Sequence, residues 1–306
     1  MNSKYSSDPT EHNAVLALCE RVAIPEPKAA IVACSLALIE TCGVVGPPLS
    51  PEHLGYARGI FRVDKKDLVF DACLIPKDSG FIVEVCKFNP RARQRFSIAH
   101  EIAHTFFIEV MPELGLPKRE TGIGLHSEYN YFEHLCDIGA AELLMPGELF
   151  RRAAAEVAPG LTGILELANR FQASLNATAR RLTALNLWSC MIVWSRFNEG
   201  AEDVAHKPKL VLRTTSADTP EFRSVRTFWA RQVSRCLRER GIVSENVCVT
   251  NEDIRMESLR VGGEVISVII PAKRQPRMSA QLPHFPSRSP TTRSKAADRQ
   301  SRLFGR

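Results

Sequence analysis

The sequence lacks the features that mark a secreted or membrane-spanning chain. No apolar core follows the first positive residues, so we expect no secretory signal. The longest apolar stretch, residues 29–39, has 11 residues and is too short to cross a bilayer. The nine cysteines are scattered and form no CxxC pair, which is typical of reduced thiols rather than of a disulfide framework. These absences predict a cytoplasmic protein.

The net charge outside the C-terminal segment is also small. The formal net charge is +6, but residues 272–306 hold nine Lys or Arg and one Asp, which is +8 and leaves −2 for residues 1–271. A nearly neutral body argues against nucleic acid or a membrane surface as the main partner. Because residues 272–306 are rich in Pro, Ser and Arg, we expect a disordered, solvated basic tail; contact of this tail with DNA is the less favoured alternative.

The whole sequence has 44% apolar residues. Residues 1–271 are long enough for two domains, each with its own core. Its patterns predict an α+β fold class. We expect a helical segment at residues 1–45, a main domain of helices and a small sheet at residues 46–188, and a smaller α+β module at residues 189–271.

Prolines and capping residues mark the predicted helix starts in the first two parts. Pro25 and Pro27 break the helical pattern of residues 11–40. The pairs Ser50-Pro51 and Asn89-Pro90 each place a capping residue before a proline and so predict a short helix and a long one. Further helices are expected near residues 131–144, 163–171 and 175–185, and strands at residues 60–63, 68–75 and 81–86 would form a small antiparallel sheet.

Residues 189–271 show a weaker pattern. Residues 190–194, CMIVW, are typical of a buried strand. Further strands are expected at residues 209–213 and 258–271, with a helix at residues 222–240 between them.

Residues 95–107, RFSIAHEIAHTFF, have the spacing of a metal site. His100 and His104 are four residues apart, so on a helix both imidazoles leave one face and can hold one Zn²⁺. Glu101 would lie beside that metal without binding it, where a carboxylate can take a proton from the metal's water. Two histidines in ordinary hydrogen bonds are the less favoured alternative, because the other faces of this helix are densely apolar.

A catalytic zinc needs a third protein ligand. Glu133 and Asp137 follow the HExxH segment by about 30 residues and, being four apart, share a helical face. One carboxylate can bind the metal while the other accepts a hydrogen bond from the far nitrogen of a ligand histidine. His134, Cys136 and Glu142 are competing ligands, but Cys136 is better explained as a small residue packed against a neighbouring helix.

Three ordered motifs resemble the ImmA/IrrE family of metallopeptidases. Residues 93–104, RQRFSIAHEIAH, are similar to the family pattern RxRFxxAHExGH. Residues 133–146, EHLCDIGAAELLMP, are similar to ExxAxxFAxxLLMP, and residues 167–174, LANRFQAS, with the later Arg181-Leu182, look like LAxxFxVS followed by RL. The resemblance covers roughly residues 40–188 and is more specific than HExxH alone.

The resemblance implies a zincin-like helical peptidase core of the gluzincin, or thermolysin, type. It assigns His100, His104 and Glu133 as zinc ligands and Asp137 as the partner that orients a ligand histidine. Glu101 would be the general base that takes a proton from the attacking water and passes it to the leaving amine.

Other positions near this site are less well defined by the resemblance. Ala103 stands in place of the usual Gly, and Cys136 and Gly139 stand where Ala and Phe are usual. These three positions concern the packing of helices. The donor to the developing oxyanion would come from the loop before Glu133, and the candidates are His126, Tyr129 and Tyr131.

The resemblance also implies a partner and a role. The expected protein substrate is a helix-turn-helix repressor of the XRE type, cleaved in a stress or mobile-element response, so that the enzyme acts in transcription regulation. The strand at residues 81–86 is either an edge on which an extended substrate pairs or an interior strand. Residues 189–271 are either a GAF-like sensor, as family relatives can carry, or a structural or dimerising unit.

A DNA-binding transcriptional regulator with a structural metal site is the competing prediction. Residues 161–185 could form a helix-turn-helix in which Ser174 caps a second helix that carries Arg180 and Arg181. The basic tail could then contact phosphates. The near-neutral body and the match of this segment to a family motif favour the peptidase instead.

Overall fold

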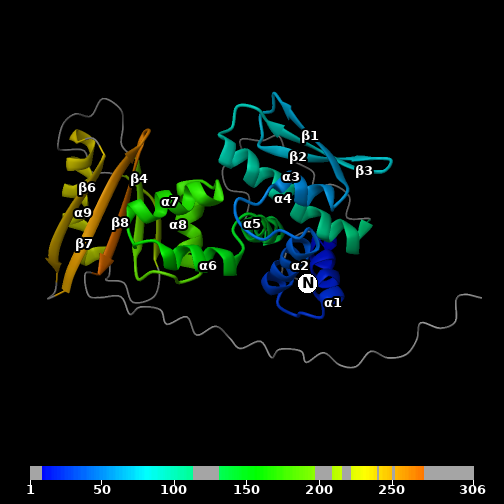
Figure 1. Cartoon of the computed structure of the whole chain (residues 1–306), viewed down its shortest axis with the longest axis horizontal. Coiled ribbons are helices and arrows are strands. Elements are labelled where there is room, and N and C mark those ends of the chain that lie inside the picture. Colours follow the sequence, from blue (N-terminus) through cyan, green and yellow to red (C-terminus); the bar gives the residue numbers. More distant parts are fainter. Residues whose placement is uncertain are drawn as a thin grey trace, which may run out of the picture. The chain divides into compact units, whose positions relative to one another are not determined.

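The structure, a computed structural model, describes residues 9–112, 131–196, 209–215, 222–239, 241–249 and 252–271. Its first helices are α1 (Pro9–Val22), α2 (Pro27–Thr41) and α3 (Pro51–Tyr56) (Figure 1). The predicted break between α1 and α2 is confirmed, since Glu26 caps α2 by accepting the backbone N–H of Ala29, and Pro27 lies in the first turn. The predicted cap of α3 is confirmed as well, because the Ser50 hydroxyl accepts the backbone N–H of His53 at 3.3 Å.

No single helix among the described residues is both long and apolar enough to cross a membrane. The segments Thr10–Val22 and Pro27–Thr41 reach that length and apolar content only as a pair, and the pair is bent by 60°. Both helices bury apolar side chains in the core of the protein, such as Val15 from α1 and Ile31 from α2.

The first sheet contains β1 (Ile60–Lys66), β2 (Ala72–Lys77) and β3 (Gly80–Cys86) in the order β1-β3-β2. It is mixed, which corrects the expectation of an antiparallel sheet: β3 is antiparallel to β2 but parallel to β1. The chain reverses direction after β1 and again after β2, so β1 and β3 point the same way, and β3 inserts between the other two strands. Because β3 is interior, it offers no edge to a substrate, and the free edges belong to β1 and β2.

Helix α4 (Arg91–Val110) follows β3 and, with α3, lies along one face of this sheet (Figure 1). The predicted helix is confirmed, but Asn89 does not cap it. The side-chain amide of Asn89 donates to Asp71 at 2.7 Å instead, and Pro90 takes the capping position. The Asp71 carboxylate also pairs with Arg93, so the first turn of α4 is tied to the residue that precedes β2.

The described chain continues with α5 (Tyr131–Leu144), α6 (Gly147–Glu156), α7 (Leu161–Phe171) and α8 (Leu175–Ala184). Helices α5, α7 and α8 match predicted helices, and Ser174 caps α8 as expected by accepting a backbone N–H at 3.1 Å. Helix α6 has no predicted counterpart, because Pro146 and Gly147 at its start are typical of a turn. It is held by the burial of Phe150 and Ala153 on one face.

The second sheet contains β4 (Met191–Arg196), β5 (Lys209–Thr215), β6 (Ile242–Val249), β7 (Glu252–Val261) and β8 (Glu264–Pro271), with α9 (Phe222–Arg238) between β5 and β6 in the chain. Its order is β5-β4-β8-β7-β6 and its pairings are antiparallel. The strand expected at residues 258–271 is two strands, because Gly262 and Gly263 form a tight turn with Gly262 in the left-handed region at φ +61°. Strand β6 was not predicted, since polar residues separate its buried valines.

The second sheet buries both of its faces. On one face, Trp229 of α9 shares a core with strand residues such as Ile254. On the other face, Trp194 and Ile266 belong to the core that contains Trp188 and the apolar side chains of the helices α1 to α8. The described residues of the chain accordingly form one compact unit.

A carboxylate from this sheet caps α7. Glu257 of β7 accepts the backbone N–H of Leu161 at 2.7 Å, and Arg255 donates to the carbonyl of Pro159 at 2.5 Å. Gly160, between Pro159 and Leu161 in the chain, has φ +145°, and a Cβ at this position would come within 2.7 Å of a Glu257 oxygen. The glycine therefore permits the close approach, and the sheet supplies the N-cap that the local sequence of α7 lacks.

Glu142 of α5 and Arg181 of α8 form a buried ion pair, with side chains 5% and 10% exposed. Glu142 also accepts the backbone N–H of Gly147 at 2.7 Å, and Arg181 also donates to the carbonyl of Met145 at 2.9 Å. These contacts join α5 to α6 and α8. Glu142 is therefore a structural residue rather than a competing metal ligand, and Arg181 is not exposed for contact with DNA.

We expect Glu142→Ala to lower the free energy of unfolding by about 3–5 kcal/mol, because it leaves the buried Arg181 guanidinium without its carboxylate. Glu148→Ala is the control, since it removes an exposed pair with Arg152 and should cost less than about 1 kcal/mol. Urea unfolding measures both. The double variant Glu142→Gln, Arg181→Met should recover part of the loss, and equal effects of the two single Glu substitutions would contradict this role.

Candidate metal centre

Helices α4 and α5 approach closely beside the two histidines. A Cβ added to Gly139 of α5 would lie 3.0 Å from the Cβ of Ala103 in α4 and 3.1 Å from Cγ1 of Ile31 in α2. Two of the positions that depart from the family pattern, Ala103 and Gly139, are thus in direct contact. Because both residues are small, the two helix backbones can come together at this point.

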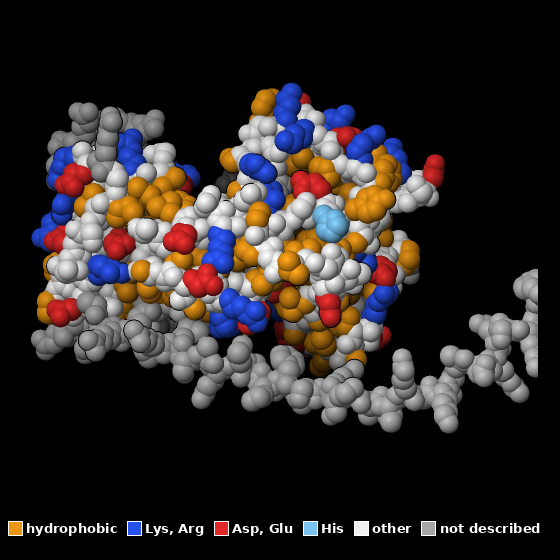
Figure 2. Space-filling view, viewed as in Figure 1, with side chains coloured by type: hydrophobic (Ala, Val, Ile, Leu, Met, Phe, Trp, Pro, Cys, Tyr) orange, Lys and Arg blue, Asp and Glu red, His pale blue; other side chains and the backbone are white. Residues whose placement is uncertain are grey.

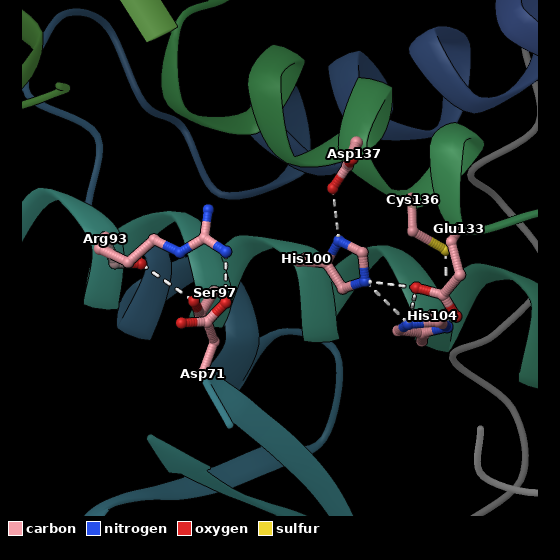
Figure 3. Close-up of polar contacts among 8 residues, drawn as sticks. All are labelled: Asp71, Arg93, Ser97, His100, His104, Glu133, Cys136 and Asp137. Atoms are coloured by element: carbon pink, nitrogen blue, oxygen red, sulfur yellow. Dashed lines mark hydrogen bonds and ion pairs between the residues drawn. The ribbon is translucent and has the colours of Figure 1, made fainter. Parts of the chain in front are cut away.

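Three side chains from these helices bring their donor atoms together (Figure 3). His100 Nε2 lies 3.0 Å from Glu133 Oε2 and 3.1 Å from His104 Nε2, and His104 Nε2 lies 3.7 Å from the same Glu133 oxygen. Ligand atoms of a tetrahedral zinc ion are about 3.3–3.6 Å apart, given bond lengths of about 2.0–2.2 Å. The three residues therefore fit one metal ion with only small movements.

The far nitrogen of each histidine contacts α5. His100 Nδ1 lies 2.9 Å from Asp137 Oδ1, and His104 Nδ1 lies 3.5 Å from the sulfur of Cys136 (Figure 3). When Nε2 offers its lone pair to a metal, Nδ1 carries the proton and donates to these partners. Asp137 can therefore hold His100 in the tautomer and orientation that a metal requires.

The surroundings set the protonation of the two rings. Burial, the largest influence, lowers the pKa of His100, but the hydrogen bonds with Asp137 and Glu133 and their negative charges raise it overall. Burial and then the neighbouring His100 lower the pKa of His104 to about 4. His104 is therefore a neutral ring at pH 7, which is the form that binds metals. Burial, with the charges of Glu133 and Asp137, raises the pKa of the Cys136 thiol well above its usual value, so Cys136 stays protonated.

The remaining candidate residues are placed as follows. Glu101 is fully buried on α4, next to His100 in the chain. His134 lies on α5 with its ring centroid 6.3 Å from that of Tyr131, the first residue of the helix. His126 and Tyr129, the other oxyanion candidates, lie outside the described residues, as does the tail at residues 272–306.

The surface over the first sheet is rich in Lys and Arg (Figure 2). Strand β1, at one edge of the sheet, exposes Arg62, Lys65 and Lys66. Exposed charges on an edge strand discourage pairing with another chain.

Two histidines four apart on one helix, facing a carboxylate from a second helix, form a candidate metal site with the ligand spacing that is typical of HExxH metallopeptidases. Residues 81–183 match the family model Peptidase_M78, the IrrE N-terminal-like domain. The chain is also 32% identical over 135 residues to the radiation response metalloprotease IrrE of Deinococcus deserti, a match that covers 41% of this chain and 44% of that protein. Both findings support assignment of the chain to the ImmA/IrrE family of metallopeptidases.

A solved structure shares the fold over more of the chain. The "Mycobacterium tuberculosis transcriptional regulator" is similar with a TM-score of 0.51 and 14% sequence identity, over 86% of this chain and 94% of that one. At this identity the similarity concerns the fold alone. The curated IrrE relative, in contrast, is matched over less than half of its length.

We expect the protein to hold one zinc ion per chain, and His100→Ala, His104→Ala and Glu133→Ala each to lose it, because each removes a donor atom. Asp137→Asn should keep the one-to-one ratio and weaken zinc affinity by about 10–100-fold, since the His100 ring loses a charged partner. Metal analysis and chelator competition measure the two effects.

His134→Ala is the matched control on the same helix and should bind zinc as the unaltered protein does. Loss of zinc in this control, or full zinc content in Glu133→Ala, would contradict the assigned ligand set.

Proposed function

We propose that the protein is a zinc-dependent endopeptidase in which His100, His104 and Glu133 bind the metal and Asp137 orients His100. The observation that carries this proposal is the convergence of three donor atoms within 4.8 Å of one another, in the part of the chain that matches the metallopeptidase family. Two histidine nitrogens and one carboxylate are one of the ligand sets of catalytic zinc sites. The division into a peptidase domain at residues 46–188 and a module at residues 189–271 belongs to the same proposal.

Glu101 is the proposed general base. A zinc ion, when bound, polarises the scissile carbonyl and acidifies a water molecule. The Glu101 carboxylate then accepts a proton from the attacking water and delivers it to the leaving amine. Its complete burial keeps bulk water away, which strengthens its interaction with nearby charges.

The proposed substrate is a helix-turn-helix repressor of the XRE type, whose cleavage relieves repression in a stress or mobile-element response. The support for this step is the similarity of the motifs at residues 93–104 and 133–146 to the ImmA/IrrE pattern. Residues 189–271 are proposed as the part that regulates cleavage, as a GAF-like sensor would. Their contact with the peptidase part through the cap that Glu257 places on α7 offers a physical link.

We expect Glu101→Gln to retain zinc and to reduce cleavage of the repressor by about 10²–10⁴-fold, because the amide cannot accept the proton of the attacking water. The measurement is co-expression with candidate helix-turn-helix repressors, taken first from neighbouring genes, followed by detection of repressor fragments and by metal analysis of the purified enzyme.

Glu166→Gln, an exposed change on α7, is the matched control and should cleave as the unaltered protein does. Cleavage by Glu101→Gln at the unaltered rate, with zinc present in both proteins, would refute the assigned base.

A further inference from the structure

Cys136 lies at a specific position relative to the candidate ligands. Glu133, Cys136 and Asp137 occupy positions i, i+3 and i+4 of α5, so the three side chains share one helical face. Asp137 contacts Nδ1 of His100, and Cys136 contacts Nδ1 of the other histidine, His104, at 3.5 Å (Figure 3). One face of α5 thus meets both imidazole rings.

This geometry excludes Cys136 as a ligand of the same metal ion. Its sulfur meets the Nδ1 side of the His104 ring, whereas Nε2 of that ring faces His100 and Glu133. The two ring nitrogens point in different directions, so a metal at Nε2 lies away from the sulfur at Nδ1, and Cys136 does not belong to the group of residues that could hold the metal. The geometry therefore contradicts the competing prediction that Cys136 is a metal ligand.

Because His104 is buried, the sulfur of Cys136 is the acceptor within reach of His104 Nδ1. The side chain of His104 is 2% exposed and Cys136 is fully buried, so bulk water does not reach the contact. A ring that offers its Nε2 lone pair carries its proton on Nδ1, and a buried N–H without an acceptor is costly. A thiol sulfur is a weak acceptor, and it satisfies this N–H where an alanine, usual at this position in the family pattern, would not.

We propose that Cys136 is a positioning residue whose sulfur accepts the Nδ1–H of His104 and so keeps Nε2 of that ring directed at the metal position. The inference rests on the proposed metal site. It gives each ligand histidine its own partner on α5, a carboxylate for His100 and a sulfur for His104. It also accounts for the contact of Cys136 with His104, whereas packing explains only the burial of Cys136.

The test compares Cys136→Ala, which removes the acceptor, with Cys136→Ser, which replaces it by a hydroxyl. Cys236→Ala is the matched control, because Cys236 is also a fully buried thiol but lies on α9 in the core of the second sheet. The first readout is ¹⁵N NMR of the histidines in the zinc-free protein, which identifies the ring nitrogen of His104 that carries the proton. The second is zinc affinity from chelator competition.

We expect His104 to be the Nδ1–H tautomer in the unaltered protein, in Cys136→Ser and in Cys236→Ala, and a mixture of tautomers in Cys136→Ala. Zinc affinity should fall by about tenfold in Cys136→Ala, at the lower end of the range for partners of ligand histidines, and be largely restored in Cys136→Ser. Urea unfolding of each variant separates this effect from a general loss of stability.

An unchanged tautomer together with unchanged zinc affinity in Cys136→Ala would overturn the proposal, and so would an equal loss of affinity in Cys236→Ala. If the unaltered protein binds no zinc, the proposed function fails instead. The tautomer of His104 in the zinc-free protein still decides whether Cys136 positions the ring.

Discussion

The close packing of α4 against α5 is the constraint on which the candidate site depends. The histidines belong to one helix and the carboxylates to the other, so the donor atoms meet only if the two backbones approach closely. Ala103 and Gly139 make this approach possible, because a side chain larger than hydrogen at Gly139 would press on Ala103 and Ile31. Ala103 is next to His104 and Gly139 is two residues from Asp137, so a shift of either helix would change the distances between the candidate ligand atoms.

Other parts of the fold hold these two helices in place. The start of α4 is tied to the first sheet through Asp71, which binds both Asn89 and Arg93. The end of α5 is tied to α6 and α8 through the buried pair of Glu142 and Arg181. Buried charges of this kind destabilise a fold unless they are paired, so they also specify which helices meet. The polar contacts thus determine the relative position of elements that apolar packing alone would leave less defined.

Residues 189–271 contribute to the same core. Their sheet packs α9 on one face and side chains of the helical part on the other, and Glu257 caps α7. Glu257 thus joins this sheet to α7, and Arg181 joins α8 to α5. These contacts are the physical support for the regulatory role proposed for residues 189–271.

The features that depend on local spacing could be predicted from the sequence. Two histidines four apart and two carboxylates four apart share one face of a helix, and α4 and α5 have these faces. Ser50 before Pro51 marks the start of α3. Which distant groups meet depends on tertiary packing. Examples are the parallel pairing of β1 with β3, the hydrogen bond of Asn89 to Asp71, the ion pair of Glu142 with Arg181, and the contact of Cys136 with His104. Helical periodicity is set within a few residues of the chain, whereas each of these contacts joins residues at least 18 positions apart and depends on how whole elements pack.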